Sequence, residues 1–187
     1  MSYVAVEELE RAVGQDLAIA YRLLRYLNSP IHALPRKIES IRHAVTLVGT
    51  SLIGNWASLV LLGRIEDKPR ELMITAMIRA HMCQQLGAAM YQRNVEQFFT
   101  VGLLSLVDAL LDRPMPEALE FLALTGEVKA ALVNHTGLMG VALECVQAYE
   151  RGDWDHTRCR NLDEKTIRDA YLSSVAWTRT ITQELVN

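Results

Sequence analysis

The apolar residues of this chain recur three and four positions apart along most of its length, in segments separated by glycine and proline. No stretch keeps the strict alternation of apolar and polar residues that marks a half-buried strand. This spacing is typical of amphipathic helices, so the sequence predicts an all-helical fold. Short connections between the segments are typical of packed helices, and we expect residues 1–187 to form a single-domain multi-helix bundle.

One segment stands out as the expected centre of the bundle. Residues from about 71 to 91 are apolar on most sides, apart from a narrow polar stripe, so we expect this helix to lie among the others. The stripe consists of Thr75, Arg79, Gln85 and Gln92. The other expected helices are "DLAIAYRLLRYLNS", which stops at Pro30, "SIRHAVTLVG" from Ser40 to Gly49, and segments near 56–62, 95–112, after Pro116, 126–134, 138–151 and 164–185.

Spacing also predicts which side chains of the last two helices face inward. In the 138–151 helix these are Leu138, Val141, Ala142, Cys145 and Tyr149, and in the 164–185 helix they are Ile167, Ala170, Tyr171, Trp177 and Ile181.

The charge balance limits the partners that the chain can attract. Its 19 basic and 22 acidic side chains give a formal charge of −3 and an isoelectric point near 6.0, which argues against general binding to nucleic acid or anionic lipid. The longest strongly apolar stretch, "WASLVLLG" at 56–63, is far shorter than the roughly 18–20 residues that cross a bilayer. We therefore expect neither nucleic-acid nor membrane binding.

The cysteines indicate a reducing compartment. The chain has an odd number of cysteines, and none of them has Cys-x-x-Cys spacing: Cys83, Cys145 and Cys159. The N-terminus lacks the basic, apolar and small-residue regions that follow one another in a signal peptide. We expect a cytoplasmic protein with reduced thiols, two of them in core helices.

No local motif supplies catalytic chemistry. The five histidines form no His-Glu-x-x-His, His-x-His or adjacent His-Asp pattern, and the chain has no nucleophile elbow and no Gly-rich phosphate loop. His81 lies in the apolar central helix and is expected to be a hydrogen-bonded core residue. His135, before Gly137, is expected to cap a helix. The sequence predicts no cofactor and no metal site.

A basic segment is the clearest candidate contact surface. "RKIESIRH" at 36–43 concentrates positive charge in a slightly acidic chain. Two interpretations of this run are open. It is either an ordinary solvated surface or a docking surface for an acidic protein. In the second case the candidate contacts are Arg36, Lys37 and Arg42. The run lacks the interleaved aromatic residues that would stack on bases.

The stretch "LLRYLNSPIHALPRKIESIRHAVTLVG" at 23–49 resembles the signature of the HDOD (HD-related output) domain family. Its helix ends in Asn-Ser. A short loop follows, and then the patterns Ile-x-Ser-Ile and Ala-x-x-x-x-Gly, at the spacing that they have in the family signature. Later segments, including "VGLLSLVDALLDRPMPEAL" and "AYLSSVAWTRTI", resemble the subgroup in which this domain follows an EAL domain, a cyclic di-GMP phosphodiesterase module. The resemblance implies an HD-domain-like fold and places this chain at the C-terminal end of a longer EAL-HDOD protein.

The resemblance also identifies a lost metal site. HD-superfamily hydrolases carry a helix reading roughly Gly-Leu-Leu-His-Asp, whose His and Asp bind metal, and alignment places that pair on Ser105 and Leu106. A serine hydroxyl is a weak ligand and leucine is none. Alignment puts Ser105 inward, whereas its spacing with Asp108 and Asp112 favours a polar stripe at the exposed edge of the helix.

Two functions follow as hypotheses. The first is a non-catalytic regulatory module of bacterial cyclic di-GMP signalling that acts through contacts with proteins, including an EAL domain. The alternative is a divergent metal-dependent phosphohydrolase that uses His81, Asp108 and His135 in place of the lost pair.

Overall fold

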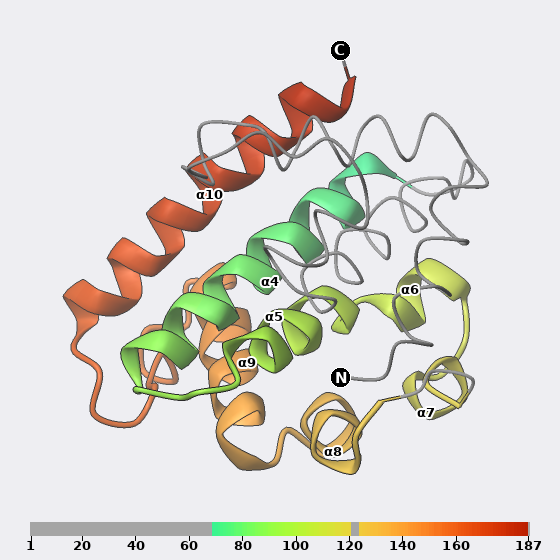
Figure 1. Ribbon diagram of the computed structural model, residues 1–187, viewed down its shortest axis with the longest axis horizontal. Helices are drawn as coiled ribbons and strands as arrows, with labels where there is room; N and C mark the ends of the chain where they lie inside the picture. Colours follow the sequence, from blue (N-terminus) through green and yellow to red (C-terminus); the bar gives the residue numbers. More distant parts are fainter. Residues whose placement is uncertain (1–68, 121–123, 187) are drawn as a thin grey trace, which may run out of the picture. The chain divides into compact units, whose positions relative to one another are not determined.

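The computed structural model describes residues 69–120 and 124–186, and all regular structure within these ranges is α-helical (Figure 1). This confirms the all-α prediction. The expected helices before residue 69 and the basic residues Arg36, Lys37 and Arg42 lie outside the described residues. The helices are α4 (Arg70–Ala89), α5 (Val95–Leu104), α6 (Val107–Leu111), α7 (Met115–Ala118), α8 (Gly126–Asn134), α9 (Gly137–Glu150) and α10 (Glu164–Val186).

Contacts along the chain divide it into two compact units, residues 65–179 and residues 1–64 together with 180–187. The first unit contains nearly all the described residues, and the fold and sites below belong to it. The expectation of one domain over 1–187 stays a prediction.

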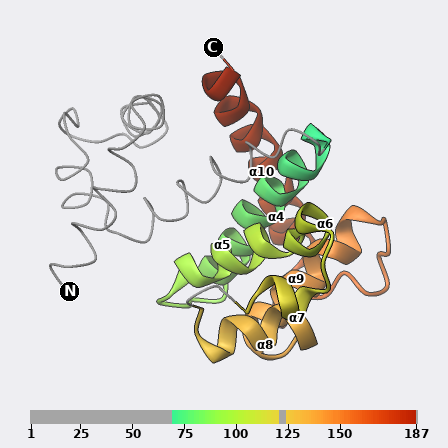
Figure 2. The ribbon, with the colours of Figure 1, turned by 90° about the vertical axis from the view of Figure 1, so that its right-hand side faces the viewer.

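The central position of α4 is confirmed. It packs along α5 and against α9, while α8 packs against both α5 and α9 (Figures 1 and 2). Because it has neighbours on several sides, α4 buries residues around most of its circumference, which is the pattern that its sequence predicts. Its buried residues are Ala76, Met77, Ala80, His81, Met82, Cys83, Leu86 and Gly87.

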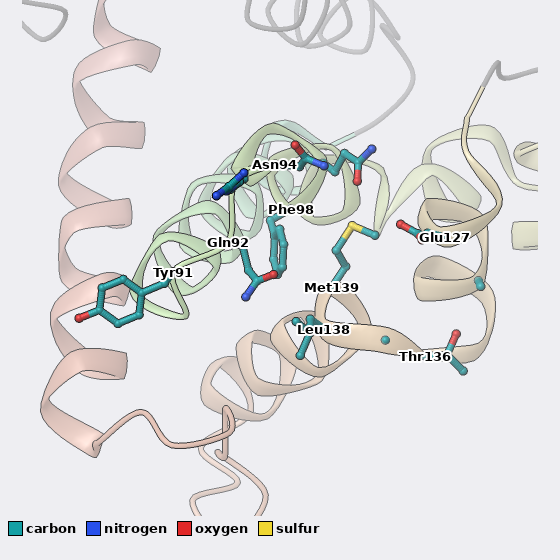
Figure 3. Close-up of a pocket in the computed structure, with 12 residues that line it drawn as sticks. Tyr91, Gln92, Asn94, Phe98, Glu127, Thr136, Leu138 and Met139 are labelled. Atoms are coloured by element: carbon teal, nitrogen blue, oxygen red, sulfur yellow. The ribbon is translucent and has the colours of Figure 1, made fainter.

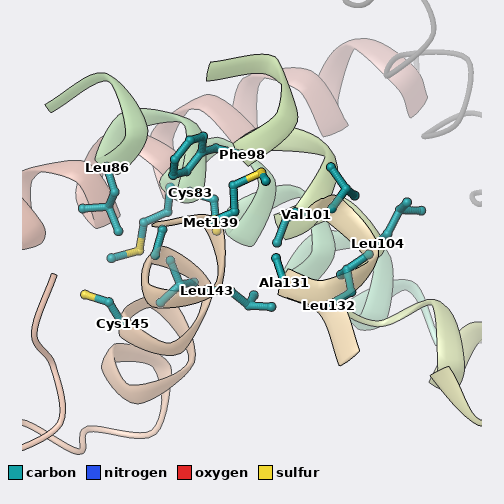
Figure 4. Packing of buried hydrophobic residues seen from close by; sticks show 14 of the residues in the cluster. Cys83, Leu86, Phe98, Val101, Leu104, Ala131, Leu132, Met139, Leu143 and Cys145 are labelled. Atoms are coloured by element: carbon teal, nitrogen blue, oxygen red, sulfur yellow. The ribbon is translucent and has the colours of Figure 1, made fainter. Parts of the chain in front are cut away.

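A single apolar cluster fills the space between these helices (Figure 4). Most of its members come from α4, α5, α8 and α9, and α6, α7 and α10 add others, so burial of the cluster holds all of these helices together. Examples are Cys83, Leu86, Phe98, Val101, Leu104, Ala131, Leu132, Met139, Leu143 and Cys145.

The expected single helix over 95–112 is wrong, because the structure divides it into α5 and α6 at Ser105 and Leu106. The main-chain N–H of Ser105 donates to the Gly102 carbonyl oxygen at 3.3 Å, and the Ser105 hydroxyl donates to the same oxygen at 2.7 Å. These bonds reach back three residues, which tightens the turn and ends the α-helix. Leu106 then takes φ −124° and ψ 14°, outside the helical range.

The inward faces of α9 and α10 differ in part from the expectation. In α9, Ala142 and Cys145 are buried as predicted, but the expected Leu138, Val141 and Tyr149 lie half-buried at the margin of the core. Because α9 contacts helices on several sides, it buries a band broader than one stripe. The residues missed are Met139, Gly140, Leu143, Val146 and Ala148.

In α10, Ile167 and Ala170 are buried as predicted, whereas Tyr171 and Trp177 are half-buried. The side chain of Ile181 lies outside what the structure describes. Two buried polar residues of this helix, Ser174 and Thr178, were not expected.

All three cysteines are free thiols, and the two in core helices, Cys83 and Cys145, are where the sequence predicts them. Cys159 is also buried, in the connection before α10.

Within residues 69–120 and 124–186, none of the helices is both long enough and apolar enough to span a membrane.

Candidate functional site

Ser105 and Leu106, which the resemblance aligns with the metal-binding His-Asp pair of HD-superfamily hydrolases, lie at the break between α5 and α6. Ser105 is buried, with 7% of its surface exposed. The inward placement implied by the alignment is therefore right, and the expectation of an exposed stripe is wrong for Ser105. Its hydroxyl donates to the Gly102 carbonyl oxygen and accepts a hydrogen bond at 3.3 Å from Nη1 of Arg79. Leu106 offers no polar atom on its side chain.

A glycine brings this turn close to α4. A β-carbon at Gly102 would lie 2.4 Å from the carbonyl oxygen of Arg79 and 2.6 Å from the α-carbon of Ala80. Only a residue without a side chain allows α5 to approach the α4 backbone this closely. Gly102 thus sets the position of Ser105 beside the Arg79 guanidinium.

Arg79 is held by a carboxylate from a third helix. Its Nε lies 2.9 Å and 3.1 Å from the two oxygens of Glu150, and its Nη2 lies 2.7 Å from Glu150 Oε2. The side chains are only 14% and 18% exposed. Two parallel hydrogen bonds between guanidinium and carboxylate fix both partners geometrically, so the pair locks α4 to the end of α9.

The sequence pattern did not identify this centre. It placed Arg79 in a polar stripe and gave Glu150 no role. The available signal was a charged residue within a helix that is otherwise apolar on most sides, because a buried charge requires a partner. The partner is 71 residues away in the sequence, and its identity depends on the packing of α9 against α4.

His81 is a hydrogen-bonded core histidine, as predicted, and its ring is engaged by α10. The Ser174 hydroxyl donates to the Ala170 carbonyl oxygen at 2.7 Å, so it accepts from Nδ1–H of His81 at 2.9 Å. Nε2 of His81 then accepts from the Gln85 side-chain amide at 3.3 Å. The ring also stacks on Trp177, with centroids 4.7 Å apart and an interplanar angle of 15°.

Burial lowers the pKa of His81 from 6.5 to about 4, because the interior disfavours the charged imidazolium. His81 is therefore neutral at pH 7, and both of its nitrogens have partners within the protein.

His135 ends α8, which confirms the capping prediction. It adopts a left-handed conformation with φ 51°, and its main-chain N–H donates to the Ala130 carbonyl oxygen. Its Nδ1 lies 3.7 Å from Oε1 of Glu144 on α9.

The structure does not bring the alternative ligands together. Asp108 lies in α6, where its Oδ1 accepts from the main-chain N–H of Ala109 at 2.8 Å, while His81 faces α10 and His135 faces α9. Across the described ranges, no three His, Cys, Asp or Glu residues are grouped so that they could hold a metal ion.

Comparison with known proteins gives a family match. The family model described as "HDOD domain" matches residues 1–127, which include α4 to α7 and the start of α8. No solved structure matches the chain.

Two curated relatives match over most of this chain. "Cyclic di-GMP phosphodiesterase CdgJ" of Vibrio cholerae is 32% identical over 187 residues, covering 97% of this chain and 43% of the relative. "Uncharacterized protein YuxH" of Bacillus subtilis is 29% identical over 180 residues, covering 92% of this chain and 44% of the relative. The chain thus spans less than half the length of each. With a family model that matches well over half of its residues, this chain belongs to the HDOD domain family.

Proposed function

We propose that this chain is a non-catalytic regulatory module of cyclic di-GMP signalling in the cytoplasm, acting through contacts with other proteins. The observation that carries the proposal is the arrangement around Ser105. The hydroxyl at the position of the superfamily's metal-binding histidine is bonded within the protein and lies 3.3 Å from the Arg79 guanidinium. The Ser105 oxygen accepts from Arg79, and the Glu150 carboxylate is engaged with the same guanidinium, so binding a metal cation here would require breaking these bonds, and Leu106 supplies no ligand.

The state of His81 supports the same proposal. A metal-binding imidazole needs a free ring nitrogen, and the hydrogen bonds to Ser174 and Gln85 occupy both nitrogens of His81. Recruiting His81 to a metal would break its stack on Trp177 or its hydrogen bond to one of these residues.

The relatives suggest where activity resides in the longer proteins. CdgJ is named a cyclic di-GMP phosphodiesterase, and this chain corresponds to only 43% of its length. We assign the phosphodiesterase activity implied by that name to an EAL domain outside the matched region. In this proposal the HDOD module either presents a docking surface or restrains the attached EAL domain, with Arg36, Lys37 and Arg42 as the contacts.

Turnover and metal content test the non-catalytic assignment. The purified chain is incubated with cyclic di-GMP and with Mg²⁺, Mn²⁺ or Fe²⁺ added in turn, and we expect no hydrolysis and no stoichiometric metal. The divergent phosphohydrolase using His81, Asp108 and His135 predicts the opposite. Our proposal would be refuted if the wild type bound metal and hydrolysed cyclic di-GMP, and if both properties disappeared in His81→Ala but persisted in the His156→Ala control.

The contact surface is tested with charge reversal. A complex with the EAL domain of a longer EAL-HDOD protein is expected to weaken in the Arg36→Glu/Lys37→Glu variant and with added salt, because exposed charges are screened. Arg113→Glu, on an exposed residue between α6 and α7, is the matched control. If the wild type, the Arg36→Glu/Lys37→Glu variant and the Arg113→Glu control bind the EAL domain equally well, Arg36 and Lys37 are excluded as contacts. Equal phosphodiesterase rates and cyclic di-GMP affinities with and without the HDOD module would exclude restraint.

A further inference from the structure

Three sulfur atoms from separate parts of the fold are linked in a row inside the core. The Cys145 thiol on α9 is hydrogen-bonded to Cys159, which lies in the connection 151–163. The Cys159 thiol in turn donates to Sδ of Met90, at the end of α4, across 3.8 Å. We call Cys145, Cys159 and Met90 the sulfur row. The remaining cysteine, Cys83 on α4, acts on the other two thiols through its charge, and no hydrogen bond joins it to either within the described ranges (Figure 4).

The order of this row favours a thiolate on Cys159. Its sulfur accepts the hydrogen bond from Cys145 and lies near the positive charge of Arg160, and these two effects lower the pKa of Cys159 although burial opposes them. The pKa of Cys145 is raised because its thiol donates to Cys159 and is buried, and burial also raises the pKa of Cys83. The thiolate is the reactive form of cysteine, so Cys159 is the expected nucleophile of the three.

Cys159 is covered by an irregular segment and not by a helix. Its side chain is buried, but the residues on either side of it, Arg158 and Arg160, are exposed. The connection 151–163 consists of turns and irregular backbone. A segment of this kind opens locally at a lower free energy than the whole fold, so a small oxidant reaches the Cys159 sulfur while α9 stays folded.

We propose that Cys145 and Cys159 are a peroxide-sensitive thiol pair that forms a disulfide within the chain. The Cys159 thiolate attacks one oxygen of hydrogen peroxide, the O–O bond breaks, and the released hydroxide leaves as water with the Cys159 proton. The Cys145 sulfur then attacks the resulting sulfenic acid, the S–O bond breaks, and a second water leaves with the Cys145 proton. The two thiols together lose two electrons, and one peroxide is reduced to two waters.

Oxidation removes a contact at the end of α4. A disulfide sulfur carries no hydrogen, so Cys159 loses the bond to Met90 that ties the connection 151–163 to α4. Gln92, whose side-chain amide donates to the Met90 carbonyl oxygen at 2.8 Å, lines a cavity of about 610 Å³ (Figure 3). The oxidised pair therefore changes the attachment of the segment beside this cavity. The proposal concerns the thiols alone and does not depend on the chain being non-catalytic.

Treatment of the folded chain with hydrogen peroxide tests the pair. The peroxide is removed with catalase, the chain is unfolded, and its remaining thiols are alkylated and counted by mass spectrometry. We expect one free thiol in place of the three present before treatment, and recovery of all three with dithiothreitol. Tryptic mapping should find the disulfide between Cys145 and Cys159, because cleavage at Arg151 and Arg158 places them in different peptides.

Alanine substitution of each cysteine tests the assigned roles, because alanine adds no polar group to the core. Cys83→Ala is the matched control and is expected to form the disulfide at the wild-type rate. Cys145→Ala should stop at the sulfenic acid of Cys159, which dimedone labels. Cys159→Ala should form neither the disulfide nor the dimedone adduct. Circular dichroism establishes that each variant is folded, and the mapping of the wild type decides the proposal if one of them is not.

Several results would overturn the proposal. One is the absence of the disulfide between Cys145 and Cys159 after an excess of peroxide, with all three thiols still free. Another is a disulfide that includes Cys83 or that links two copies of the chain. A disulfide that forms in urea but not in the folded chain would show that the pair is closed to oxidants in the native structure, and this also rejects the proposal.

Discussion

Acidification should destabilise this fold through His81. Folding buries the ring against Trp177 and lowers its pKa from 6.5 to about 4, chiefly because burial disfavours the imidazolium. The unfolded chain therefore binds a proton at this residue near pH 6.5, whereas the folded protein does not bind it until about pH 4. Between these values the unfolded state holds more protons, so the free energy of unfolding falls as the pH falls.

The size of the effect follows from the two pKa values. The difference between 6.5 and about 4 corresponds to a loss of about 3 kcal/mol when the pH has fallen below both values. At pH 5, where the folded form is still mostly neutral, about 2 kcal/mol of this is already lost. Well above pH 6.5 the imidazole is neutral in both states and contributes no pH dependence.

Urea unfolding of the wild type and His81→Phe at pH 8 and pH 5 measures this term. Phenylalanine keeps a ring to stack on Trp177 but cannot titrate, and Ser174 keeps its hydrogen bond to the Ala170 carbonyl. The comparison at pH 8 measures the change in packing together with the loss of the hydrogen bonds from His81 to Ser174 and Gln85. We expect the wild type to lose about 2 kcal/mol more than the variant between pH 8 and pH 5. Equal losses in the two proteins would refute a neutral, buried His81.

Three further predictions concern the close contacts of the fold. Gly102→Ala should lower the free energy of unfolding by about 2 kcal/mol or more in urea titrations, because its β-carbon would meet the α4 backbone. Gly126 has open space around it, so Gly126→Ala should not lower the free energy of unfolding, and equal effects of the two substitutions would disprove the close approach. Glu150→Gln should lower the free energy of unfolding by about 1–3 kcal/mol in urea titrations, because the partly buried Arg79 guanidinium loses its counter-charge. Arg79→Met combined with Glu150→Leu should recover much of that loss, so a single variant as stable as the wild type would contradict a stabilising pair. Tyr91 has a left-handed backbone with φ 57° and an exposed ring, so Tyr91→Gly should leave the melting temperature unchanged or raise it, with a gain of up to about 1 kcal/mol in the free energy of unfolding. A clearly lower melting temperature would show that the ring supports the fold.

Helix type and most helix positions were accessible from the sequence. The 3.6-residue period of apolar side chains in α4, α8, α9 and α10 is a local property, and residues such as His135 mark the end of a helix by local geometry. The absence of a metal-binding pair at Ser105 and Leu106 is likewise a property of residue types, so it follows from the resemblance without coordinates.

The break at Ser105 was not accessible in this way. The sequence around it continues the apolar period, and the break comes from bonds to the Gly102 carbonyl and from the nearby Arg79 side chain. The period of a segment reports which face is apolar, but it does not report the bonds that a single hydroxyl makes.

That this protein is helical and that α4 is central could both be read from the amino-acid sequence, because each depends on the kinds and spacing of residues within one segment. Which residues meet across the fold could not be read in that way: the packed helices show that Arg79 pairs with Glu150, that His81 stacks on Trp177 and that Gly102 lies against the α4 backbone. These contacts join residues far apart in the chain, and a pairing of that kind exists only once packed helices bring the two partners within a few ångströms of each other.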